Sequence, residues 1–112
     1  MSDDVNFYIM KFEPKVQKRL MEIRFSVFDV FQNLEERIYH AVPTITFNSQ
    51  DIMNYGAFKS HISIWLSYNL IDFLKKNYLQ YGYTKHTIQF PHKDPFPNEL
   101  IKEICEMLWK DR

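Results

Sequence analysis

The sequence predicts one α+β domain, residues 1–112, in which helices cover one face of a five-stranded antiparallel sheet. Two observations lead to this fold class. Apolar residues recur at helical spacing near both ends of the chain, whereas residues 35–66 hold short β-branched and aromatic segments separated by turn-forming residues. Strands that follow one another through short turns form antiparallel sheets. A length of 112 residues suits one domain with one modest core.

Two helices begin the predicted order of elements, which is α-α-β-β-β-β-α-β-α. Residues 2–4 are Ser-Asp-Asp, which suit a helix start, and residues 5–12 place apolar side chains on one side of a first helix. Pro14 suits the first turn of a second helix. The apolar arc of this second helix is wider than one buried face needs. Phe25 and Phe28 therefore either complete the core or form a pocket or a subunit contact.

Four strands come next in the chain, and a fifth comes nearer its end. They are predicted at residues 35–40, 44–47, 55–58, 61–66 and 87–90. The first two are joined by a bend at residues 41–43, where Pro43 belongs at a strand start or edge because it cannot donate to a ladder. Residues 48–51 form a turn that leads into a β-hairpin over residues 51–66.

The hairpin of residues 51–66 is the most informative stretch. A two-residue turn at Lys59-Ser60 sets its register, and side chains then alternate between two faces. One face is wholly apolar and is predicted to be the core side: Met53, Tyr55, Ala57, Ile62, Ile64 and Leu66. The other face carries three facing pairs: Phe58 with His61, Gly56 with Ser63, and Asn54 with Trp65. Its small central pair lies between large side chains and predicts a hollow that could hold a ligand.

The rest of the chain supplies two more helices. The third begins near Ser67, and Gly82 ends this region. A proline-rich loop follows the fifth strand, and Pro97 and Glu99 suit the first turn of a final helix. The apolar face of this final helix contains Leu100, Ile101, Ile104, Cys105 and Leu108. Cys105 is therefore expected to be inert core packing.

Composition and charge exclude several classes of function. Fourteen basic and fourteen acidic residues cancel, so charge gives no reason to expect binding to nucleic acid or to an anionic membrane. A single cysteine excludes an internal disulfide and a cysteine-pair metal motif, which favours a reducing compartment. The N-terminal stretch is acidic, and no apolar run approaches the length of a membrane span. We therefore expect a cytoplasmic protein, and the sequence contains no motif for a cofactor.

Four stretches of the chain resemble a known family. They are Pro43-Thr44, the segment AFKSHI at residues 57–62, the segment KHTIQFP at residues 85–91 and the segment PFPNELI at residues 95–101. Together they are similar to the YdhG-like family, a small bacterial domain of mostly unassigned function, and the resemblance extends from Val5 to Trp109. It implies a bent antiparallel sheet with helices on one side. Two family glycines are replaced here, by Ala41 and His86.

The predicted function is that of a non-enzymatic binding domain with its ligand or partner surface on the hairpin. No nucleophile–base pair, phosphate-binding glycine loop or suitably spaced acid pair is present, so an enzyme is not expected. The predicted ligand-binding residues are Phe58, Lys59, His61, Trp65, Lys85 and Gln89. Their three cationic side chains, beside two aromatic rings, could hold a small anionic ligand, provided that His61 and Lys85 converge. The alternative is that the two lysines only keep their turns soluble.

Two other hypotheses remain open. Some YdhG-like proteins are described as frataxin-like intracellular iron chaperones, so the resemblance implies iron bound through surface carboxylates. Here, however, acids are interleaved with bases in the early helices and first strand, as on an ordinary solvated surface, and the four histidines lack metal-site spacing. The last hypothesis is a homodimer through an open sheet face that carries Phe58 and Trp65.

Overall fold

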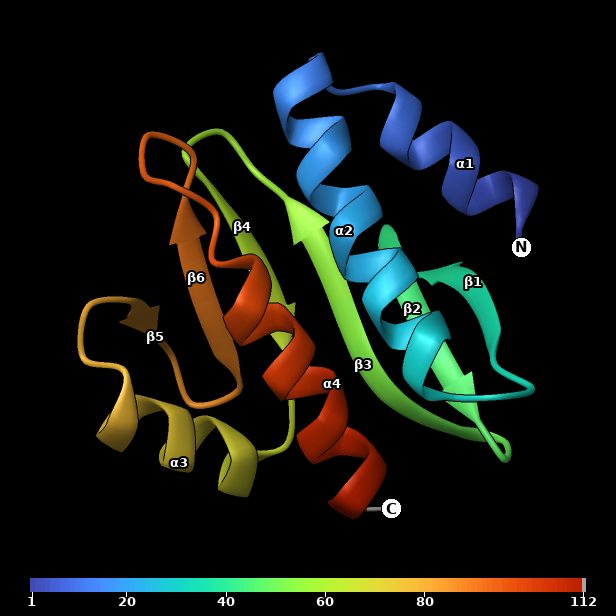
Figure 1. Ribbon diagram of the computed structural model, residues 1–112. Coiled ribbons are helices and arrows are strands. Elements are labelled where there is room, and N and C mark those ends of the chain that lie inside the picture. Colours follow the sequence, from blue (N-terminus) through green and yellow to red (C-terminus); the bar gives the residue numbers. More distant parts are fainter. Residues whose placement is uncertain (112) are drawn as a thin grey trace.

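The computed structural model describes residues 1–111, and its helices lie against one face of an antiparallel sheet (Figure 1). The helices are α1 (Asp3–Met10), α2 (Pro14–Val30), α3 (Tyr68–Asn77) and α4 (Asn98–Asp111). The strands are β1 (Glu35–Tyr39), β2 (Val42–Phe47), β3 (Gln50–Ala57), β4 (His61–Trp65), β5 (Gly82–Tyr83) and β6 (Thr87–Pro91). Their order in the sheet is β1-β2-β3-β4-β6-β5, with α2 and α4 side by side across its middle. The α+β class is therefore confirmed.

The sheet has six strands in the described residues, where the sequence predicts five. The additional strand is β5, whose residues Gly82 and Tyr83 pair with Gln89 and Ile88 of β6. A strand of two residues is too short to give an alternating pattern in the sequence. Gly82, which was expected to end the region after the third helix, lies within this strand instead.

Two tight turns connect the first three strands. His40 and Ala41 join β1 to β2, and Asn48 and Ser49 join β2 to β3; all four have a positive φ, between 50° and 67°. Two-residue hairpin turns favour this conformation because its twist matches that of the flanking strands. The predicted bend at residues 41–43 is therefore a turn at residues 40–41, and Pro43 is the second residue of β2.

The predicted register of the hairpin is confirmed. Asn54 pairs with Trp65, and Gly56 pairs with Ser63. The Lys59-Ser60 turn joins the two strands without positive φ values, so the poor fit of these residues to a left-handed turn is avoided. The residues assigned to the core side are all buried: Met53, Tyr55, Ala57, Ile62, Ile64 and Leu66. The sequence thus predicts correctly which face of the hairpin packs against the helices.

The helices bury the faces that their apolar spacing predicts. In α1 and α4 the buried residues are Val5, Tyr8, Ile9, Leu100, Ile101, Ile104 and Cys105. The wide apolar arc of α2 divides: Phe28 packs partly against the core, whereas Phe25 is 47% exposed. The core explanation therefore holds for Phe28 and not for Phe25.

A buried ion pair joins the first two helices to the sheet. The guanidinium of Arg24 on α2 binds the carboxylate of Glu36 on β1, and the side chains are 1% and 2% exposed. Arg24 also donates to the side-chain oxygen of Asn6 on α1. Both charges were expected on an ordinary solvated surface, which is wrong for this pair. Linear charge patterning does not reveal burial when the partners lie on different elements.

Candidate functional site

A row of three ring-bearing side chains from the hairpin lies on the sheet face opposite the helices. Phe58 stacks on His61 with ring centroids 5.4 Å apart, and it meets Trp65 edge to face at 6.0 Å. Phe58 is 43% exposed, and the other two are half-buried. We call Phe58, His61 and Trp65 the aromatic surface. Three of the six predicted ligand-binding residues therefore lie together.

The hollow that was predicted between these rings is filled. Gly56 and Ser63, its expected floor, are both buried. Two small residues leave space, and the rings of Phe58 and Trp65 approach each other across it. Gly56 is also covered by β2, because a Cβ added there would lie 2.8 Å from Cγ1 of Val42. The aromatic surface is thus closed over the centre of the hairpin.

The three predicted cations do not converge. His61 begins β4, and Trp65 ends it, opposite Thr87 of β6. Lys85 precedes Thr87 in the chain and so lies beyond the Trp65 end, whereas Lys59 lies in the turn beside His61. The length of a five-residue strand, about 13 Å, separates the two ends. An anion site made jointly by His61 and Lys85 is therefore excluded.

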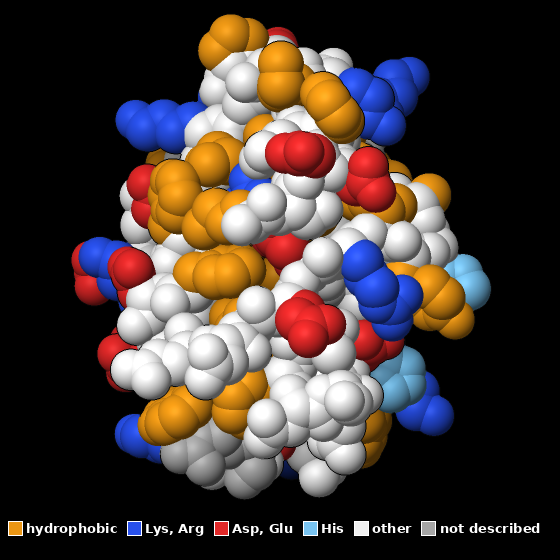
Figure 2. All heavy atoms as spheres, turned by 90° about the vertical axis from the view of Figure 1, so that its right-hand side faces the viewer, with side chains coloured by type: hydrophobic (Ala, Val, Ile, Leu, Met, Phe, Trp, Pro, Cys, Tyr) orange, Lys and Arg blue, Asp and Glu red, His pale blue; other side chains and the backbone are white. Residues whose placement is uncertain are grey.

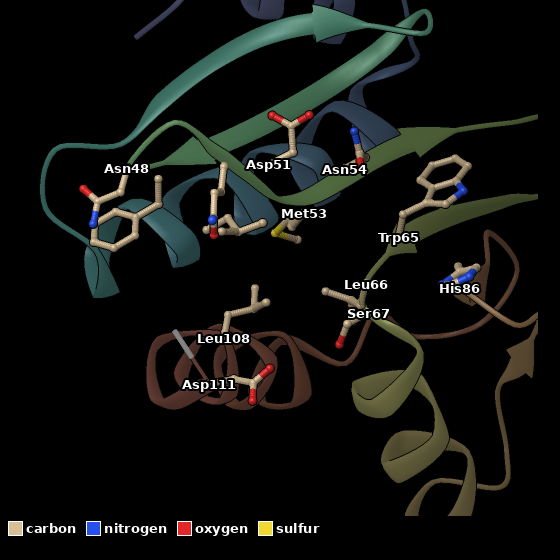
Figure 3. Close-up of a pocket in the computed structure, with 13 residues that line it drawn as sticks. Asn48, Asp51, Met53, Asn54, Trp65, Leu66, Ser67, His86, Leu108 and Asp111 are labelled. Carbon is tan, nitrogen blue, oxygen red and sulfur yellow. The ribbon is translucent and has the colours of Figure 1, made fainter.

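A cavity of about 690 Å³ lies at the Trp65 end of β4 (Figure 3). It exists because β3 is longer than β4. Residues 50–53 of β3 pair with β2, but the last pair between β3 and β4 is Asn54 with Trp65. After Leu66 the chain turns into α3, so β4 does not accompany the first half of β3. The C-terminal end of α4 closes the cavity from the helical side.

The lining of this cavity combines apolar side chains at its centre with polar ones around them. Met53 of β3, Leu66 after β4 and Leu108 of α4 point into it from three elements (Figure 3). Trp65 and His86 lie close to each other at one side. Apolar walls with an aromatic side are typical of sites that hold the body of a small molecule.

The rim of the cavity carries hydrogen-bond acceptors. Asn54 donates its amide to Oγ1 of Thr44 at 2.7 Å, which leaves its side-chain oxygen available as an acceptor. Asp51 is paired with Arg37, whose Nη2 lies 3.1 Å from both carboxylate oxygens. Asp111 ends α4, where the last carbonyls add partial negative charge. The described lining residues include two aspartates and one histidine, but no lysine or arginine.

Sequence reasoning missed most of this cavity, and Trp65 is its one predicted ligand-binding residue among those described. The cavity depends on β3 extending beyond the end of β4. The alternation of apolar and polar residues in the sequence does not show where a partner strand stops. The end of α4 reaches the cavity only through the fold. Polar residues such as Asn54 and Asp51 on a predicted hairpin were the available signal.

A second hollow, of about 500 Å³, lies at the opposite end of β4. It is lined by His61 and Gln89, two of the predicted residues, together with Ser60, His92 and Lys93. Gln89 is therefore brought to His61, because β4 and β6 pair Ser63 with Gln89. The six predicted residues thus divide between the two ends of the hairpin.

The iron hypothesis gains no support from the part of the chain that the structure describes. There, no three side chains of His, Cys, Asp or Glu gather as ligands for a metal ion. Figure 2 shows acidic side chains scattered among basic and hydrophobic ones on the side of α1 and β1. Within residues 1–111, no helix has the length and apolar character needed to cross a membrane.

Comparison with known proteins identifies the fold. No protein-family description matches the sequence, and no curated protein is similar to it in sequence. Among solved structures, the chain is similar to a Bacillus subtilis protein of the DUF1801 family, ydhg, with a TM-score of 0.83. The two are 20% identical, and the match covers 97% of this chain and 90% of that one. The resemblance noted in the sequence is therefore confirmed at the level of structure: this chain has the fold of the DUF1801 protein ydhg.

Proposed function

We propose that the chain is a non-enzymatic binding domain whose ligand site is the cavity at the Trp65 end of β4. One observation carries this proposal. Three apolar side chains from different elements point into the gap where β3 extends beyond β4, and polar residues that include Asn54 and Asp111 complete its lining. Its volume of about 690 Å³ lies within the range of roughly 300–1,000 Å³ that is usual for small-molecule sites.

The ligand class follows from the rim. Asn54 and Asp111 offer acceptors, the C-terminal end of α4 favours positive charge, and Trp65 supplies a ring face for a cation. A small molecule with an apolar body and an amino group fits these features. A small anion would meet the carboxylate of Asp111, and the described lining residues include no lysine or arginine. The carboxylate of Asp51 is already paired with Arg37.

The test uses two probes that share a ring and differ in charge, benzylamine and benzoate. Trp109 is replaced by Phe, so that Trp65, the other of two tryptophans, reports alone. Benzylamine is expected to change the Trp65 fluorescence saturably. It should bind at least about tenfold more tightly than benzoate, because one charge-assisted hydrogen bond contributes about that factor in affinity. No saturable response to either probe rejects the cavity as a small-ligand site, and tighter binding of benzoate rejects the amine class.

A matched pair of variants on α4 separates the cavity from general charge. Asp111→Asn removes the carboxylate at the rim, whereas Glu106→Gln removes an exposed carboxylate one turn earlier that does not line the cavity. Benzylamine binding should weaken several-fold in the first variant and stay unchanged in the second. Equal weakening in both would mean that the amine responds only to the overall charge of the helix.

A second candidate is a homodimer through the open sheet face. Phe58 and Tyr39 are 43% and 45% exposed there, although they are large hydrophobic side chains. Light scattering at high protein concentration should then give twice the monomer mass, and Phe58→Asp should restore the monomer. Phe25→Asp on α2, at 47% exposure, is the matched control and should leave the dimer intact. A monomeric wild type rejects this candidate.

A further inference from the structure

The hollow at the His61 end of β4 has a different chemical character from the cavity at the Trp65 end (the Trp65 cavity). Its polar lining consists of Ser60, His61, Gln89, His92 and Lys93. Three of these side chains can carry positive charge, and none of the described lining residues is an acid. A volume of about 500 Å³ gives room for a small ligand. The two ends of one strand therefore face hollows of opposite electrostatic preference.

Further cations lie behind the loop that forms this hollow. The ammonium of Lys15 donates to the carbonyl of His92 at 2.8 Å, and the guanidinium of Arg19 donates to the same carbonyl at 3.2 Å. Arg19 is only 8% exposed, and it also donates to the carbonyl of Asp94 at 2.7 Å. Lys59 lies in the adjoining turn. Basic side chains thus outnumber acidic ones around this loop, which also carries the carboxylate of Asp94, although the whole chain is neutral.

The loop is fixed against the hairpin turn by His92. Its Nε2 lies 2.7 Å from the carbonyl oxygen of Phe58, and its backbone amide donates to the carbonyl of Ser60 at 2.9 Å. His92 therefore positions the loop. His61, whose Nδ1 is 3.4 Å from Oγ of Ser60, keeps its other ring nitrogen for a ligand. Lys93 follows His92 in the same loop, and its side chain also lines the hollow.

We propose that this hollow binds a phosphate group, either free or carried by a small molecule. Lys93 supplies charge, and the Gln89 amide supplies a hydrogen-bond donor. The bonded pair of Ser60 and His61 supplies one more donor, either the hydroxyl or the second ring nitrogen, so the groups come from three segments. The sequence predicts an anion site from Lys59, His61 and Lys85. The fold keeps the first two at this end and provides Lys93 and His92 where Lys85 was expected. This site is independent of the Trp65 cavity.

The test is a titration of the ¹⁵N-labelled chain with inorganic phosphate, with chloride holding the ionic strength constant. Amide signals of residues 60, 61, 89, 92 and 93 should shift saturably, while those around the Trp65 cavity should not. Lys93→Ala and His61→Gln should each weaken binding about tenfold, the loss of one charge-assisted hydrogen bond. The spectrum of each variant also reports whether it is folded.

Lys85→Ala is the matched control, because it removes the same charge at the other end of β6. Its binding of phosphate should stay within about twofold of wild type, as expected for a screened, distant charge. Shifts without saturation, or equal weakening by Lys85→Ala and Lys93→Ala, would overturn the proposal. Glycerol phosphate distinguishes the two sources: tighter binding than inorganic phosphate indicates a phosphorylated small molecule, and equal binding indicates the free anion.

Discussion

The rings of Phe58 and Trp65 meet edge to face, with centroids 6.0 Å apart, across the small residues that separate them on the sheet. This contact closes the centre of the hairpin and leaves a hollow at each end of β4. The contact therefore separates the two hollows, one at the Trp65 end of β4 toward α4 and one at the His61 end beside the loop after β6.

The close packing around Gly56 makes it sensitive to any side chain. A Cβ there would lie 2.8 Å from Cγ1 of Val42 and 3.1 Å from the hydroxyl of Tyr8. Gly56→Ala should therefore lower the free energy of unfolding by about 1–3 kcal/mol, measured by urea denaturation. Gly82→Ala is the control, because its Cβ would meet only the flexible Gln89 side chain at 3.3 Å or more. Equal stability of the two variants would contradict the described packing.

Ala41 occupies a backbone conformation that favours glycine. Its φ is +67° in the turn between β1 and β2. Ala41→Gly should raise the free energy of unfolding by about 1 kcal/mol, because it relieves the contact of Cβ with the backbone. Ala57→Gly, in an ordinary strand conformation, should be destabilising instead. Thermal and urea denaturation of both variants would show whether the signs are opposite.

Two buried tyrosines should respond in opposite ways to the loss of a hydroxyl. The hydroxyl of Tyr55 is buried without a hydrogen-bond partner in the described residues, whereas that of Tyr8 accepts from the backbone amide of Ala57 at 3.1 Å. Tyr55→Phe should raise the free energy of unfolding by about 1 kcal/mol, and Tyr8→Phe should lower it by about the same amount. Destabilisation by Tyr55→Phe would show that its hydroxyl has a partner after all.

Alkaline pH should destabilise the fold partly through Cys105. Burial, together with the nearby carboxylates of Glu106 and Asp29, raises the pKa of this thiol to about 12. The unfolded thiol ionises near pH 8.5, so stability is fully present below that pH and is lost as pH rises toward 12. Between about pH 9 and 11, the unfolding free energy of the wild type should fall with pH more steeply than that of Cys105→Ala. The difference between the two slopes should be roughly 1.4 kcal/mol per pH unit. Identical slopes for wild type and variant would contradict this.

The sequence was sufficient for the orientation of the hairpin. Met53, Ile62 and Ile64 repeat with the period of a strand, and the two-residue spacing at Lys59-Ser60 leaves one register that keeps them together. The helices could be predicted equally well, because their apolar residues recur every three or four positions. Such patterns act within one element, so they can be detected without knowing what packs against it.

The features that the sequence could not supply depend on contacts between elements. The Phe58–Trp65 contact depends on side-chain directions, the burial of Arg24 depends on α1 and β1, and the Trp65 cavity depends on where β4 ends. Lys85 and Lys93 are similar in sequence terms, yet the register of β4 with β6 places them at opposite ends. Pairing register therefore decides which cations share a site.

The most direct measurement is a set of nuclear Overhauser effects between the ring protons of bound benzylamine and the protein. We expect contacts with the methyl groups of Met53, Leu66 and Leu108, which point into the gap where β3 outlasts β4. Contacts only with Phe58 or Tyr39 on the outer face of the sheet, or none at saturating benzylamine, would contradict the proposal that this gap is the ligand site.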